Sequence, residues 1–119
     1  MSDQLQEKMI ESTAAKFEKQ FGMKPAAVAV APGRVEVLGN HTDYNGGYVC
    51  PAAIDRWTYV AARSRPDQLV RMIAADLDDE DQFSLEHIEH SDLHPWSDYL
   101  RGVTAGLLDR GSSYEEQTY

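Results

Sequence analysis

Residues 26–54 read AAVAVAPGRVEVLGNHTDYNGGYVCPAAI, and two apolar segments in this stretch flank a segment rich in turn residues. Val28 and Val30, and later Val35 and Val37, alternate with smaller or polar residues. A period of two is typical of a strand with one buried face. We therefore predict a half-buried strand that begins at the start of this stretch and carries all four valines.

The segment between the apolar runs, residues 39–47, begins and ends with glycine and contains the pair Asn45-Gly46. Such a pair is typical of tight hairpin turns. Strand character resumes over residues 48–54 and continues over residues 57–63. We therefore expect a strand, a turn-rich loop and a returning strand.

Helices are predicted on either side of these strands. Residues 3–21 predict an amphipathic helix because apolar side chains recur at three-, four- and five-residue steps, and Gly22 suits the left-handed position past its end. Residues 96–109 predict a second helix, with Pro95 at its first position. Its apolar stripe is Trp96, Tyr99, Leu100, Val103, Leu107 and Leu108. We expect four aromatic residues to lie in the core or at its edge: Trp57, Tyr59, Trp96 and Tyr99.

Two further strands are predicted before the second helix, over residues 69–75 and 83–88. Residues 78–81 are all acidic, and this charge predicts a turn between the two strands. No repeat, low-complexity tract or linker divides the chain, so residues 1–119 are expected to form one domain. The order of helix, several strands and helix indicates the α+β class.

The charge of the chain is concentrated in one segment. Twenty acidic and eleven basic residues give a net charge of −9, and residues 76–98 hold nine of the acids and no lysine or arginine. We interpret this segment as a solvated face. A chain without a basic stripe lacks the surface that nucleic acids require, so a nucleic-acid partner is not expected.

The sequence also suggests a compartment. It contains no apolar run of the roughly 20 residues that cross a bilayer, and its start, MSDQLQEKMIES, does not resemble a secretory signal. The one cysteine, Cys50, is consistent with a reducing environment. We therefore expect a cytoplasmic protein without a membrane partner, in which Cys50 is a buried, inert thiol.

The loop of residues 39–47 and the strand before it concentrate polar groups. Arg34 is a cation with five donors that suits a phosphate or a carboxylate. Asp43 could accept hydrogen bonds from two sugar hydroxyls, and His41, Thr42 and Tyr44 could both donate and accept. This mixture favours a polyol ligand. The alternative from the residues alone is an ordinary loop, with Arg34 paired to Glu36 on an exposed strand.

Three histidines in the acidic segment raise the question of a metal site. His87, His90 and His94 are three and four residues apart, a helical spacing in a segment with strand character. We interpret them as surface residues and predict no metal site in this chain, with metal binding as the minor alternative.

The run GRVEVLGNHTDYNGGYVCPAAIDR, residues 33–56, closely resembles the signature of galactokinases, which belong to the GHMP superfamily of small-molecule kinases. The leading amphipathic helix, the APGR entry, the PAAID strand and the YLRGV helix also occur in the order expected for that family. The resemblance implies the N-terminal domain of a GHMP kinase, with a mixed or antiparallel sheet and helices mainly on one face.

The resemblance further implies ATP-dependent phosphorylation of the anomeric hydroxyl of galactose or a related sugar, with ATP and Mg²⁺ as cofactors. Asp43 would match the aspartate that binds two adjacent ring hydroxyls, and His41 would lie beside the exocyclic hydroxymethyl. Arg34 would match the arginine that supports the transferred phosphoryl group and the catalytic base. Tyr44 would support the loop. The implied substrate-binding set is Arg34, Glu36, Asn40, His41, Asp43 and Tyr44.

Two positions depart from the family pattern. Glu36 stands where the family usually has asparagine, and Asn40 stands where it usually has a glutamate that accepts a hydrogen bond from the sugar 6-hydroxyl. Neutral Asn40 is a weaker acceptor that can also donate. We hypothesise a substrate altered at C6 or C4, or a uronic acid.

The glycine- and serine-rich ATP loop of the superfamily and its catalytic aspartate have no match in these 119 residues. We therefore expect the ligands of ATP and Mg²⁺ to lie mostly beyond residue 119, with no cofactor-binding residue in this chain, and we expect the chain alone to be inactive. The alternative function is a non-catalytic sugar-binding or sensor protein derived from a galactokinase. Self-association through an uncovered strand or apolar face stays open.

Overall fold

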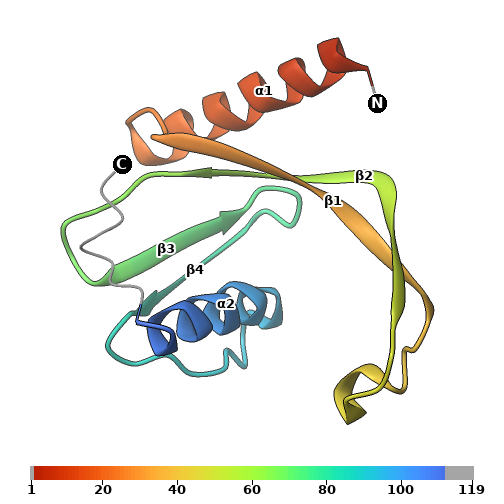
Figure 1. Cartoon of the computed structure of the whole chain (residues 1–119). Coiled ribbons are helices and arrows are strands. Elements are labelled where there is room, and N and C mark those ends of the chain that lie inside the picture. Colours follow the sequence, from red (N-terminus) through yellow and green to blue (C-terminus); the bar gives the residue numbers. More distant parts are fainter. Residues whose placement is uncertain (1, 112–119) are drawn as a thin grey trace. The chain divides into compact units, whose positions relative to one another are not determined.

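The computed structural model describes residues 2–111, apart from the side chain of Asp43. The chain forms two compact units, Met1–Arg63 and Ser64–Tyr119, and each contains one two-stranded antiparallel sheet and one α-helix (Figure 1). The α+β class is therefore confirmed, with two separate sheets where we expected one. None of the helices within residues 2–111 has the length and apolar character needed to cross a membrane.

The first unit begins with α1 (Asp3–Phe21), which has the predicted bounds. Gly22 ends the helix in the left-handed conformation, with φ at 73°, and its N–H donates to the Glu18 carbonyl at 2.8 Å. This geometry confirms the predicted C-cap. The half-buried residues of α1 recur at helical spacing on one side, which is where the helix contacts the adjoining strands; they are Gln6, Ile10, Thr13, Ala14, Phe17 and Phe21.

Strands β1 (Ala27–Leu38) and β2 (Cys50–Ala62) pair in antiparallel fashion along nearly their whole length. The register shifts between Pro32 and Gly33, where two residues of β2, Asp55 and Arg56, have no partner on β1. A side chain at Gly33 would lie 3.2 Å from the Arg56 carbonyl. Glycine therefore lets β1 approach β2 closely where the register shifts.

The predicted common buried face of the four valines is wrong. Val28 and Val30 are half-buried, whereas Val35 and Val37 are exposed. Val30 and Val35 are five residues apart, and successive side chains of a strand point to opposite faces, so a continuous strand places the two pairs on opposite sides. Cys50, predicted to be buried, is likewise exposed.

The second unit contains β3 (Leu69–Ala74), β4 (Asp79–Ser84), the short 3-10 helix η2 (Pro95–Ser97) and α2 (Asp98–Asp109). The turn predicted at residues 78–81 is wrong, because it lies three residues earlier in the chain. The chain reverses over residues 75–78, and β4 begins at Asp79. A single bridge between Ser84 and His87 follows, where a strand was predicted.

The acidic residues Asp79 and Asp81 can be part of β4 because their carboxylates accept hydrogen bonds from side chains of the second unit. Asp81 and Arg101 have side chains only 12% exposed, and Arg101 Nη2 donates to Asp81 Oδ2 at 2.7 Å. The wholly buried Ser97 donates to the same oxygen at 2.6 Å. The Arg101 guanidinium also lies 4.8 Å from the centre of the buried Phe83 ring. A charged pair thus packs on an aromatic ring beside the small apolar core of Met72 and Phe83.

Three aspartates of residues 76–98 are held by named partners, so this segment is not simply a solvated face. Asp79 accepts hydrogen bonds from Trp96 and His94, which lower its pKa. Burial of Asp81 opposes its ionisation, but the hydrogen bonds from Ser97 and Arg101 outweigh burial and lower its pKa. The backbone N–H of Ser91 and the His90 ring lower the pKa of Asp98.

Replacing Arg101 by alanine should destabilise the second unit by about 2–3 kcal/mol, because the shielded Asp81 carboxylate would lose its cation. Three further residues would each lose a hydrogen bond from Arg101: Gln82, Glu89 and Ser97. The matched control is Arg71→Ala, which removes an exposed pair with Glu80 (2.9 Å) and should cost less than about 1 kcal/mol. Urea unfolding followed by tryptophan fluorescence measures both. Equal losses in the two variants would contradict the role given to Arg101.

Candidate functional site

The polar residues singled out in the sequence gather at one end of the β1/β2 pair. We call residues 39–47 the signature loop; it joins Leu38 at the end of β1 to the segment that enters β2, and it contains the 3-10 helix η1 (Asp43–Asn45). Figure 1 shows this loop at the tip of the bent β1/β2 ribbon. The predicted arrangement of strand, loop and returning strand is confirmed.

Thr42 organises the signature loop through both its side chain and its backbone. Its hydroxyl Oγ1 lies within hydrogen-bond distance of the Tyr48 carbonyl (2.8 Å) and the Gly39 carbonyl (3.1 Å). Its own carbonyl accepts from the N–H of Gly47 at 2.7 Å and of Asn45 at 3.2 Å. We call this set of contacts the Thr42 clasp. The threonine expected to offer groups to a ligand instead holds the loop closed.

Two glycines make the clasp sterically feasible. Gly39 has φ at 101°, and a side chain there would lie 2.5 Å from the Tyr48 carbonyl oxygen. A side chain on Gly47 would lie 2.5 Å from Thr42 Cβ. Any other residue at either position would push the loop apart, since real Cβ atoms do not approach other atoms so closely.

The clasp leaves other side chains of the loop directed to solvent. Asn40, His41 and Tyr44 are all exposed, and the His41 ring nitrogen Nδ1 lies 3.4 Å from the Tyr44 hydroxyl. Asn45 donates its side-chain amide to the His41 carbonyl at 2.9 Å, which fixes the backbone beneath the imidazole. Asp43 begins η1, and its side chain lies outside the described part of the structure.

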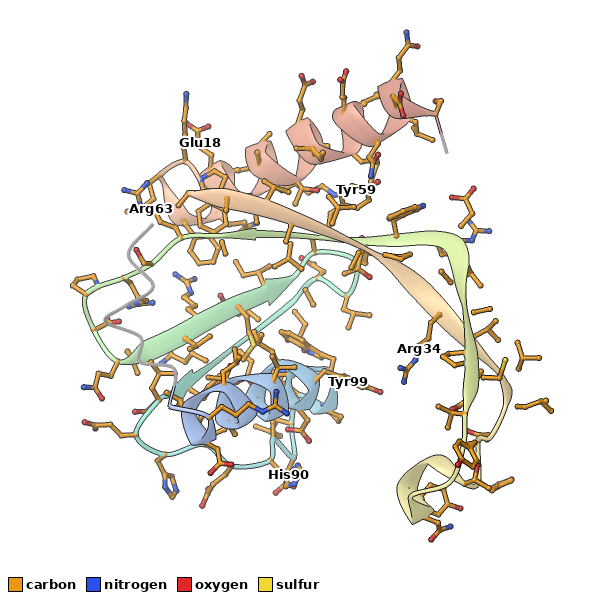
Figure 2. The ribbon with its side chains drawn as sticks, viewed as in Figure 1. Glu18, Arg34, Tyr59, Arg63, His90 and Tyr99 are labelled. Atoms are coloured by element: carbon orange, nitrogen blue, oxygen red, sulfur yellow. The ribbon has the colours of Figure 1, made fainter. Side chains whose placement is uncertain are left out.

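Arg34 and Glu36 lie on β1, in the strand segment that leads into the loop. Arg34 pairs with Ala53 of β2 and Glu36 pairs with Pro51. Being two residues apart, they share one face of the strand. Arg34 is exposed and projects from the ribbon (Figure 2), whereas Glu36 is half-buried. The structure thus brings the side chains of His41 and Tyr44 together. Arg34 lies on β1, four residues before the strand ends at Leu38.

This arrangement can recognise hydroxyl groups. An imidazole, a phenol, an amide and a guanidinium offer donors and acceptors from a loop whose backbone is held by internal hydrogen bonds. All of these side chains are exposed, however, and ligand sites normally bury most of their ligand in a concave pocket. The described side chains of the signature loop therefore could contact a ligand from one side without enclosing it.

The histidines of the acidic segment have other partners. His87 lies 2.8 Å from Glu89, His90 lies 3.1 Å from Asp98, and His94 lies 2.8 Å from Asp79. Each ring is thus paired with one carboxylate. Among the side chains that the structure describes, no three from histidine, cysteine, aspartate or glutamate come together in a group that could hold a metal ion.

Comparison with known proteins points to one family. Residues 15–64 match the galactokinase galactose-binding signature. The chain is 53% identical over 96 residues to galactokinases of Chloroflexus aggregans and Chloroflexus aurantiacus, and 51% identical over 96 residues to that of a Roseiflexus species. Each match covers 81% of this chain. The chain spans about a quarter of the length of these curated relatives, 25%, 25% and 24% respectively.

Replacing Thr42 by valine, which keeps the shape of the side chain but removes its hydroxyl, should loosen the signature loop. We expect the amide hydrogens of Asn45 and Gly47 to exchange about five- to tenfold faster, since one lost hydrogen bond is worth about 1 kcal/mol. Hydrogen exchange followed by NMR measures this. Thr42→Ser keeps the hydroxyl and should retain slow exchange. Wild-type exchange rates in Thr42→Val would show that the clasp does not hold the loop.

Proposed function

We propose, from the premise that this chain is a galactokinase-related segment, that its signature loop binds galactose or a closely related hexose for a sugar kinase. We further propose that the chain corresponds to part of the N-terminal domain of a GHMP kinase. The observation that most directly supports this proposal is the Thr42 clasp, because it holds the loop in one shape while leaving Asn40, His41 and Tyr44 exposed.

Each side chain has a role that its chemistry permits. The carboxylate of Asp43, on the first residue of η1, would accept hydrogen bonds from two adjacent ring hydroxyls. His41, oriented by Asn45 beneath it and Tyr44 beside it, would contact the exocyclic hydroxymethyl. Arg34 would lie near the anomeric oxygen, where its fixed positive charge stabilises negative charge that develops during phosphoryl transfer.

Magnesium and ATP enter this proposal only through the family. ATP would supply the phosphoryl group, and Mg²⁺ would neutralise charge on it. Magnesium is usually bound through one or two carboxylates together with the substrate phosphates, and we expect the residues that hold it to lie mostly beyond residue 119. We therefore assign no step of the reaction to either group in this chain.

Replacing Asp43 by asparagine should abolish sugar binding, because the amide has one neutral acceptor oxygen where the carboxylate has two charged ones. The measurement is an NMR titration of the labelled chain with galactose, read at the amides of the signature loop. Asp92→Asn is the matched control, since Asp92 is an exposed aspartate outside the loop. Equal binding by wild type and Asp43→Asn would refute the assignment.

A pair of assays distinguishes a sugar kinase from a non-catalytic sugar sensor. We expect no sugar phosphate from the chain alone with ATP and Mg²⁺. We then define the chimera as the Chloroflexus aggregans galactokinase in which the aligned segment is replaced by this chain, which is feasible at 53% identity. Sugar phosphate formed by the chimera supports a kinase. Sugar binding without phosphate would support the non-catalytic alternative.

Position 40 should set sugar preference. Asn40 is exposed at the start of the loop, and a carboxylate there would accept a hydroxyl hydrogen more strongly than an amide does. In the chimera, Asn40→Glu should raise kcat/KM for galactose relative to a sugar altered at C6 by about tenfold or more. Steady-state kinetics on both sugars measures the ratio. A wild-type chimera that already prefers galactose exclusively would rule out an altered substrate.

A further inference from the structure

Helix α2 exposes its apolar side and packs through a polar one. Tyr99, Leu100, Val103 and Leu107 are 84%, 41%, 59% and 45% exposed. We call these four residues the outer stripe of α2. The half-buried positions are instead Arg101, Thr104 and Leu108, together with Asp98 in the first turn. The expectation that Tyr99 lies in the core is therefore wrong, and Figure 2 shows its side chain projecting from the helix.

The orientation of α2 follows from its polar contacts. Besides Asp81, Arg101 donates to Ser97 Oγ at 3.1 Å and to the Glu89 carbonyl at 3.1 Å. At about 100° per residue, Val103 and Leu107 lie on the side of the helix opposite Arg101 and Leu108. Turning the outer stripe inward would break the contacts of Arg101, so the second unit alone cannot bury it.

The outer stripe has the features of a packing surface. Surface helices normally bury an apolar stripe and leave the polar side to water, and α2 does the reverse. Gly102 and Gly106 flank the stripe, and a side chain built at either would meet nothing within 4 Å. The helix backbone is therefore open to close approach beside four apolar side chains.

We propose that the outer stripe is the contact surface for the part of a galactokinase polypeptide that lies outside the 96 matched residues. The curated relatives are about four times as long as the matched segment, so they contain a large region that this chain does not match. Buried apolar side chains are few here, namely Met72 and Phe83 among residues 2–111. The relatives thus supply a partner for a surface that the second unit does not itself cover.

This inference rests on the relationship to galactokinases and not on sugar binding. Its test therefore measures how accessible the surface of α2 is to a reagent in water, and does not measure ligand affinity. A cysteine is placed at position 103 in the outer stripe, Val103→Cys, or at position 105, Ala105→Cys. Ala105 is an exposed residue of the same helix outside the stripe. Both variants carry Cys50→Ser, because the natural thiol is exposed. The rate of labelling by a water-soluble maleimide is measured in the free 119-residue chain and in the chimera.

In the free chain, both cysteines should react at similar rates. In the chimera, labelling at position 103 should slow by about tenfold or more, while labelling at position 105 changes little. Unchanged labelling at position 103 in the chimera would overturn the proposal, as would equal protection of both positions. Protection of position 103 in the free chain would also overturn it, because a second copy or another part of the chain would then cover the stripe. A chimera that does not fold, where the parent enzyme does, counts against it as well.

The second variant is Val103→Glu, with Ala105→Glu as its control. Each adds one negative charge to α2. In the free chain neither should shift the thermal midpoint appreciably, because both positions are exposed. In the chimera, only Val103→Glu should lower it, since a charge would be placed in an apolar interface. Equal midpoints for the two chimera variants would contradict the assignment, whatever their sugar-binding properties.

Discussion

Side-chain hydrogen bonds fix the local shape of both units of the chain. In the first unit, the Thr42 clasp links one threonine to four neighbouring residues across the exposed signature loop. In the second unit, polar atoms that leave water must find partners, and Asp81, Ser97 and Arg101 come together over the Phe83 ring. Met72 and Phe83 are the buried apolar side chains among residues 2–111, so in this part of the chain the polar contacts and the strand pairing contribute much of the specificity of the fold.

The sequence predicts local features well and misses those that depend on distant partners. Helix α1 and its Gly22 cap follow from periodicity and from the freedom of glycine, both of which are local. The start of β4 and the orientation of α2 depend on Arg101, which lies twenty residues beyond Asp81. In the sequence alone, a run of acidic residues looks like a solvated turn. Its place in a strand becomes clear only when the side chains that donate hydrogen bonds to its carboxylates are known. Likewise, an apolar helical stripe reads as a core face although here it is exposed.

The candidate site shows the same division. From the residue types around the signature loop we predict a hydroxyl-rich ligand, and residues 15–64 match the galactokinase galactose-binding signature. The role of Thr42 could not be predicted, because a hydroxyl that binds a ligand and one that binds a carbonyl six residues away look identical in sequence. The only available sign was the pair of glycines that the clasp requires, at positions 39 and 47.

The contacts of the Thr42 clasp all lie between residues 39 and 48, which has an evolutionary consequence. The residues that shape the loop differ from the exposed residues that we propose to contact the sugar, so the second set can change without disturbing the first. Asn40 can be exchanged for other side chains at little structural cost because it takes no part in the clasp. Under the proposed function, a loop built in this way would allow new sugar preferences to arise by single substitutions, and it could be transplanted onto another hairpin with its internal contacts intact.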